Sequence, residues 1–333
     1  MNPFISNSPV LGHDFFNRET VIKKIIKETL TDKAQGDVWL IGERQVGKTS
    51  VLKRLHQAKD LLPAEIVVYN TNQKYKPLFA FANVQSCDNV SDFYFSLFVS
   101  LNNELDLKLK HQKDQKQNFI NALKIMTEKN IYTVFLVDEF DAFLEAIALE
   151  DKNNIRRFIN EFEPLLKGYS VFKNRAFSCV FASNQDFADL NFKHELNLTG
   201  SGLVAKRIEL EWFPETTVKN LVKHFTSNKK TKFTDSEIKT ICKYTEGYPY
   251  FTMNILKILY DYKTENKLEK VDNLIIDTLA KNEYEQTIQF WIGQNMPKRT
   301  NAKLIELLKS AGEKLFEAAL KILIEYSKVN FIK

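Results

Sequence analysis

The sequence is poor in cysteine, and its few cysteines follow none of the usual functional spacings. Cys87, Cys179 and Cys242 are odd in number, lie far apart and form no C-x-x-C pair. This pattern argues against a disulfide framework and a zinc site, because both need ordered sets of cysteines. The cysteine pattern fits a protein of a reducing compartment. The histidines are equally scattered, and we interpret each as structural or solvated: His13, His56, His111, His194 and His224.

The chain also lacks long apolar runs, a leader pattern and internal repeats. No run approaches the roughly 18 apolar residues of a membrane helix, and no cationic segment followed by an apolar one stands at the N-terminus. The sequence therefore predicts a soluble, cytoplasmic protein without membrane contact. Its 333 residues suggest two or three domains at about 100 to 200 residues each. A formal net charge of +5 permits contact with nucleic acid without arguing for it.

A complete phosphate loop, G-x-x-x-x-G-K-[ST], occupies residues 42–49. An apolar run at 37–41 precedes it and an amphipathic run follows, so the glycines stand where a strand turns into a helix. In such a loop, Lys48 reaches the β- and γ-phosphates of a nucleotide and the Thr49 hydroxyl ligates Mg²⁺. The predicted nucleotide-binding residues here are Gly42, Glu43, Arg44, Gln45, Val46, Gly47, Lys48, Thr49 and Ser50.

A second apolar run, residues 132–137, ends in the adjacent carboxylates Asp138 and Glu139. An acid at the carboxyl end of a parallel strand beside the phosphate-loop strand lies where ligands bind in open α/β sheets. We expect Asp138 to be a magnesium ligand and Glu139 to orient and deprotonate the attacking water. Asp141 follows two residues later, and its position fits either a helix start or the outer shell of the magnesium.

A third apolar run, residues 177–183, precedes Asn184. An amide at this position can hold the attacking water or contact the γ-phosphate, so we place Asn184 with Lys48 and Glu139 among the catalytic residues. The alternative is a strand-ending asparagine that satisfies its own turn. Guanine specificity has no support, because residues 228–231 lack the acid of the Asn-Lys-x-Asp motif.

The pattern changes near residue 200 from alternating strands and helices to helices alone. Residues 205–212 alternate as a short edge strand, Thr234 and Glu237 form a capping-box pattern, and Gly247 with Pro249 marks a helix stop. We expect an α/β fold, a P-loop parallel sheet sandwiched by helices, followed by an all-α lid and a helical subdomain that fits a winged helix. The expected domains are residues 1–210, 211–270 and 271–333.

Several segments together resemble the prokaryotic AAA-like ATPases of the STAND group, also called archaeal-type ATPases, relatives of the origin-recognition and AAA+ proteins. The segments are 2–4, 15–19, 42–49, 138–139, Asn184 and 247–249. The resemblance covers roughly residues 1–260. It implies that Arg18, in a Phe-Gly-Arg-Glu motif whose glycine is replaced by Asn17, and Pro249, in a Gly-x-Pro lid motif, lie near the nucleotide. It also implies that Arg207 is a trans-acting finger or a lid sensor.

The sequence thus predicts a Mg²⁺-dependent ATPase that acts as a molecular switch, with its nucleotide state coupled to lid movement or self-association. The resemblance implies a DNA or protein effector and a mobile-element or defence context. The alternative is a DNA-binding or partner-binding module in which ATP is a structural ligand or a slow timer. Its support is a set of basic residues in the C-terminal third: Lys229, Lys230, Lys298 and Arg299.

Overall fold

The computed structural model describes residues 2–4, 15–31, 35–57, 61–67, 73–105, 113–168, 175–185, 187–196 and 205–283. Internal contacts divide the chain into two compact units. The sheet unit is Asn7–Glu211, and the helical unit is Trp212–Lys333 together with Met1–Ser6. Among the described residues, no helix combines the length and the apolar character needed to cross a membrane.

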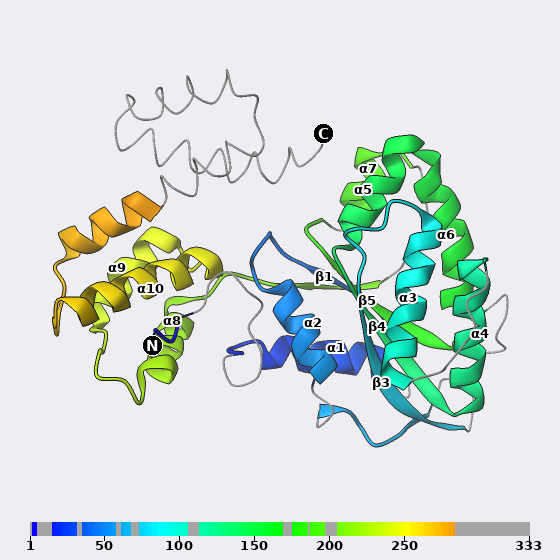
Figure 1. The fold of residues 1–333 in the computed structure, drawn as a ribbon, viewed down its shortest axis with the longest axis horizontal. Helices are drawn as coiled ribbons and strands as arrows, with labels where there is room; N and C mark the ends of the chain where they lie inside the picture. The colour runs from blue at the N-terminus through cyan, green and yellow to red at the C-terminus, as the bar shows by residue number, and fades with distance from the viewer. Residues whose placement is uncertain are drawn as a thin grey trace. The chain divides into compact units, whose positions relative to one another are not determined.

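A six-stranded sheet forms the centre of the sheet unit, with the strand order β2-β3-β4-β5-β1-β6 (Figure 1). The strands are β1 Asp37–Ile41, β2 Ile66–Val67, β3 Lys74–Asn83, β4 Ile131–Asp138, β5 Phe177–Ser183 and β6 Ala205–Glu209. All neighbours pair in parallel except β2 with β3. Strands β1, β4 and β5 are buried along almost their whole length, as strands covered on both faces should be.

One expectation about the sheet is wrong. The strand that ends in Asp138 does not lie beside the phosphate-loop strand β1, because β5 pairs with both and separates them. The polar end of β5, with Ser183 and Asn184, therefore stands between the phosphate loop and Asp138. Strand β3 begins at Lys74, and Lys74, Tyr75 and Lys76 alternate exposed and buried along the pleat.

Helices cover both faces of the sheet (Figure 1). On one face lie α1 Glu19–Leu30 and α2 Lys48–Gln57; the other carries α3 Val90–Leu105, α4 Gln115–Glu128, α5 Phe140–Glu150, α6 Asn153–Leu166 and α7 Phe187–Lys193. Phenylalanine rings fill the core between the sheet and the helices α3 to α7. Phe140, the first residue of α5, stacks on Phe181 of β5 with ring centroids 4.4 Å apart, and Phe143 stacks on Phe93 at 4.7 Å. These contacts fix the start of α5 beside the polar strand ends.

The helical unit contains α8 Glu215–Thr226, α9 Asp235–Thr245 and α10 Pro249–Glu265, and residues 273–283 form a further helical stretch. The N-terminal segment belongs to this core. Phe4 is buried, with its ring centroid 5.7 Å from Phe225, 5.8 Å from Phe233 and 6.0 Å from Tyr260. The first six residues thus group with the helical unit, whereas we expected them with residues 1–210. Most of the expected subdomain 271–333 lies outside the described residues.

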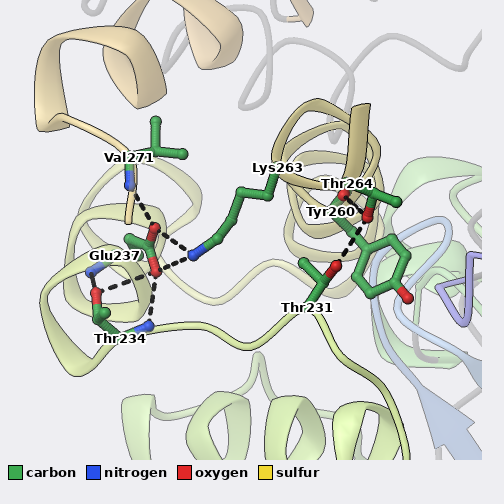
Figure 2. A network of polar contacts seen from close by, with 7 residues as sticks. All are labelled: Thr231, Thr234, Glu237, Tyr260, Lys263, Thr264 and Val271. Atoms are coloured by element: carbon green, nitrogen blue, oxygen red, sulfur yellow. Dashed lines mark hydrogen bonds and ion pairs between the residues drawn. The ribbon is translucent and has the colours of Figure 1, made fainter. Parts of the chain in front are cut away.

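A buried ion pair joins α9, α10 and the segment that follows (Figure 2). Lys263 Nζ donates to both carboxylate oxygens of Glu237, at 2.7 and 2.9 Å, and neither side chain is exposed. Val271 N donates to Glu237 at 2.9 Å, and Thr234 N donates at 2.6 Å as part of a capping box that the sequence predicted. These additional bonds offset the cost of removing two charges from water.

Candidate nucleotide-binding site

The phosphate loop between β1 and α2 needs its two glycines for different reasons. Gly47 has φ +107°, a conformation that side chains rarely adopt, and a β-carbon added there would have no heavy atom within 4 Å. Gly42 has no such backbone constraint, but a β-carbon there would stand 2.7 Å from Val46 Cγ1 and 3.2 Å from Leu210 Cβ. Conformation therefore requires glycine at position 47, and close packing requires it at position 42.

Lys48, the first residue of α2, is buried and folds back over the loop. Its Nζ donates to Gly42 O at 2.7 Å, to Glu43 O at 2.9 Å and to Asn184 Oδ1 at 2.8 Å. An ammonium group has three protons, so these acceptors use all of them. Burial lowers the pKa of Lys48, and the negative charges of Asp141, Glu139 and Asp138 oppose that effect. A phosphate that binds Lys48 has to displace one of its present acceptors.

Asp138 ends β4 with a buried carboxylate that the protein leaves incompletely satisfied: the Thr49 hydroxyl and the Glu139 backbone N–H lie near it, but neither forms a hydrogen bond of good geometry. The residue is 1% exposed, and neither carboxylate oxygen has a hydrogen-bond partner among the described residues. Burial raises the pKa of Asp138, although the nearby Thr49 hydroxyl and Lys48 act in the opposite direction. An uncompensated buried carboxylate is costly, and a divalent cation would satisfy it.

The residues around Asp138 fit Mg²⁺. This ion is commonly held by one or two carboxylates with substrate phosphates and waters, and a phosphate-loop threonine supplies a further oxygen. In the described part of the chain, no group of three or more His, Cys, Asp or Glu side chains could hold a metal alone. Asp138 and Thr49 would therefore hold the ion only together with phosphate oxygens and water.

Glu139 adopts a left-handed backbone conformation, with φ 59° and ψ 40°, immediately before α5. For a residue other than glycine this costs about 1 to 2 kcal/mol, and such strain occurs often at functional sites. The ring stacking of Phe140 and the bond from Phe143 N to Glu139 O hold the turn in place. Burial raises the pKa of Glu139, and the neighbouring charges of Asp138 and Asp141 raise it further. A raised pKa suits a general base.

Asn184 connects Lys48 to Asp141. Its backbone N and its Nδ2 donate to Asp141 Oδ2 at 3.0 and 2.8 Å, while its Oδ1 accepts a hydrogen bond from Lys48 Nζ. The amide is therefore engaged with the site and does not serve its own turn. Asp141 lies in the first turn of α5 and bonds directly to Asn184, a contact that sequence reasoning missed. An acid soon after the Asp-Glu pair was its only sequence signal.

Arg18 contacts the phosphate loop from the start of α1. Its guanidinium donates to Val46 O at 3.4 Å and to Glu211 O at 2.7 Å. Burial lowers the pKa of Arg18 to about 10, and the Glu211 charge opposes the shift. Asn17, which replaces the glycine of the related motif, has φ 56°. Asparagine enters this left-handed region more readily than other side chains, so Asn17 can form a left-handed turn without glycine.

The remaining expected site residues, Arg207 and Pro249, come from other elements, and their roles stay predictions. Arg207 is paired in register with Trp39, in the middle of β1, and its guanidinium forms a half-exposed ion pair with Glu209 at 3.3 Å. Pro249 belongs to the helical unit, where it is the first residue of α10. The structure thus brings together Lys48, Asp138, Glu139 and Asn184, and adds Asp141.

Comparison with known proteins gives a structural relationship. No protein-family model matches the chain, and no curated protein matches it. The Aeropyrum pernix ORC2 protein with ADPNP and ADP superposes with a TM-score of 0.55 and 13% identity, covering 98% of this chain and 89% of that one. A Walker-type ATPase of Pyrococcus abyssi gives a TM-score of 0.62 at 14% identity, covering 98% and 93%. The fold is that of the P-loop ATPases.

A third similar structure was solved with nucleic acid. The Aeropyrum pernix ORC1 protein in complex with DNA gives a TM-score of 0.54 at 13% identity, covering 92% of this chain and 74% of that one. At such identities the likeness concerns the fold alone. The shared fold is a mostly parallel sheet flanked by helices and followed by a helical C-terminal part.

Proposed function

We propose that the protein is an ATP-binding, Mg²⁺-dependent ATPase that works as a molecular switch of the AAA/STAND type. The observation that carries this proposal is the buried carboxylate of Asp138, which has no hydrogen bond of good geometry although Thr49 and the phosphate-loop Lys48 lie near it. A structural role alone gives no reason to bury a carboxylate with such incomplete hydrogen bonding, since this costs free energy. A magnesium nucleotide supplies the missing charge.

The chemistry assigned to the chain is mostly positioning and charge stabilisation, as in phosphoryl transfer generally. The loop amides and Lys48 would bind the phosphates, and Asn184 would contact the γ-phosphate or the attacking water. Glu139 would orient that water and accept its proton. Mg²⁺, held by Thr49, Asp138 and phosphate oxygens, would supply charge neutralisation at the β- and γ-phosphates.

The switch would couple the nucleotide state to movement of the helical lid or to self-association. Arg207 lies on the edge strand β6 with its side chain half exposed, which suits contact with the nucleotide of a second copy better than a role in its own site. Pro249 and Arg18 are proposed to respond to the nucleotide from the lid and from the loop. The proposed context, a mobile-element or defence system of the cytoplasm, rests on the resemblance to STAND ATPases.

Nucleotide binding and turnover by three variants test this function. Lys48→Ala should abolish ATP binding, whereas Glu139→Gln should bind ATP and fail to hydrolyse it. Lys23→Ala, an exposed lysine on α1, is the matched control and should behave as wild type. Hydrolysis at the wild-type rate by Glu139→Gln would remove Glu139 from the mechanism. Wild-type protein that binds ATP without turning it over would favour a structural ligand or slow timer.

A DNA-binding or partner-binding function is the second candidate, and the DNA complex of the similar ORC1 protein favours its nucleic-acid form. Duplex DNA added to the turnover assay should stimulate hydrolysis if DNA is the effector. Affinity measured at increasing salt should then fall steeply, because phosphate contacts release counterions. Lack of retention on DNA at low salt would remove this candidate and direct attention to a protein effector.

A further inference from the structure

The three acceptors around Lys48 Nζ are not equivalent. Gly42 O and Glu43 O are backbone carbonyls of the phosphate loop, so they move only if the loop moves. Asn184 Oδ1 is the acceptor on a side chain, and it comes from the end of β5. It is therefore the acceptor that Lys48 can exchange for a phosphate oxygen at the smallest structural cost.

The orientation of the Asn184 amide depends on Asp141. A side-chain amide has one accepting end and one donating end. Asp141 Oδ2 accepts from both Asn184 Nδ2 and Asn184 N, so the donating end is held and the accepting end is turned toward Lys48. Asp141 is 5% exposed, and its other oxygen, Oδ1, has no hydrogen-bond partner among the described residues.

We propose that Asp141 is a positioning residue of the phosphate site, which holds Asn184 as a latch on Lys48 that bound phosphate has to open. The latch is the series Asp141, Asn184 and Lys48. This inference rests on the proposed function, because it assumes that phosphate binds at Lys48. When Lys48 passes to a phosphate, Asn184 stays bonded to Asp141 and so remains beside the phosphate on which it acts.

The latch predicts opposite effects on binding and on chemistry when Asp141 is removed. In Asp141→Ala the amide is free to turn, and Lys48 loses its third fixed acceptor. ATP then no longer has to displace the hydrogen bond between Lys48 and Asn184, so the affinity for ATP should rise about three- to tenfold. Turnover should fall about tenfold or more, because Asn184 is no longer oriented. A simple loss of stability would not raise affinity while lowering turnover.

The experiment is a double-mutant cycle read by calorimetric titration with ATP, with and without Mg²⁺, and by turnover. Asn184→Ala should reproduce Asp141→Ala, and the double variant should go no further than either single variant. Asp141→Asn should stay close to wild type, since both bonds end on one oxygen and an amide oxygen can accept both. Asp92→Ala removes a half-buried acid from the first turn of α3 and controls for helix-end charge.

The outcomes separate the latch from the proposed function. If the wild-type protein binds ATP and Asp141→Ala and Asn184→Ala bind it with the same affinity, the latch is overturned and the proposed function stands. Changes in ATP affinity and turnover that multiply in the double variant would also overturn the latch. An Asp141→Asn protein with turnover as low as that of Asp141→Ala would overturn it too, because the role of Asp141 would then depend on its charge. Wild-type protein that binds no nucleotide would overturn both proposals. If Asp141→Ala does not fold, unchanged ATP affinity in Asn184→Ala would still overturn the latch, and Asp141→Asn still tests the role of the Asp141 charge.

Discussion

The carbonyl oxygen of Phe213 lies where a side chain at Gly247 would have to stand. A β-carbon added at Gly247 would be 1.8 Å from Phe213 O and 2.9 Å from the carbonyl carbon. Phe213 N also donates to Gly247 O at 2.8 Å, and Gly247 has φ +81°. Both the backbone conformation and the close approach require glycine between α9 and α10.

Gly247→Ala should therefore destabilise the helical unit. The left-handed conformation alone costs about 1 to 2 kcal/mol in a residue with a side chain, and the clash with rigid backbone adds to it. Urea unfolding followed by circular dichroism measures the loss. Gly36→Ala is the control, because the nearest atom to its added β-carbon is Glu28 O at an ordinary 3.5 Å. Equal stability of both variants would contradict this account.

The ion pair of Glu237 and Lys263 gives a second prediction. Lys263→Met leaves the buried Glu237 carboxylate without its counter-charge, and breaking such pairs costs about 3 to 5 kcal/mol. We expect the free energy of unfolding to fall by that order. The double variant Glu237→Gln with Lys263→Met removes both charges and should recover a large part of the loss. A double variant as unstable as the sum of the single ones would show that the charges are not coupled.

The ionisation of Tyr132 should lower the free energy of unfolding at alkaline pH. Complete burial raises its pKa to about 12, and its hydroxyl forms a 2.7 Å hydrogen bond with the Ser178 hydroxyl. The native state favours the protonated phenol, so this contribution is fully present below the unfolded pKa near 10 and is lost as the pH rises toward 12. At pH 11 the loss is about 1.4 kcal/mol.

Comparison with Tyr132→Phe isolates this effect from other groups that titrate in alkali. The variant loses the hydrogen bond to Ser178 at every pH but cannot ionise at position 132. Its unfolding free energy should consequently decline less than that of wild type between pH 8 and pH 11. Parallel curves for the two proteins would mean that the native and unfolded states share one tyrosine pKa.

Much of the site could be predicted from local sequence. The phosphate loop, the Asp138 strand and the Asn184 strand each have an apolar run that ends in polar residues, and that pattern is local. The order of the strands is not local, and β5 was not foreseen between β1 and β4. The pairing of Asp141 with Asn184 joins residues 43 positions apart in the chain, and no periodicity reports such a contact.

Left-handed backbone conformations were the other feature that the sequence did not predict. A glycine at position 17 would have predicted a left-handed turn. Asn17 has a left-handed backbone conformation, with φ 56°, although its residue type does not predict one as clearly. Glu139 is left-handed as well, and nothing in its residue type suggests it. Such conformations depend on packing around the turn, here the stacking of Phe140 on Phe181, which only the folded chain supplies.

Phe4 supplies a fourth prediction. The side chain is 2% exposed among Phe225, Phe233 and Tyr260, so Phe4→Ala removes a core ring from the helical unit. Loss of about 3 kcal/mol is expected, as for other buried phenylalanines. Phe192→Ala, at a ring 88% exposed, is the matched control and should change stability little. Equal thermal midpoints for the two variants would contradict the burial of Phe4.

The same residue constrains the order in which the chain can mature during synthesis. Phe4 is synthesised before its partners Phe225, Phe233 and Tyr260, which follow more than two hundred residues later. The sheet unit, encoded between them, has its complete set of strands before the helical unit can close its core. The Phe4 ring therefore stays without its packing partners while the sheet unit is synthesised, and a change near Phe4 would interfere with the last step of folding rather than the first.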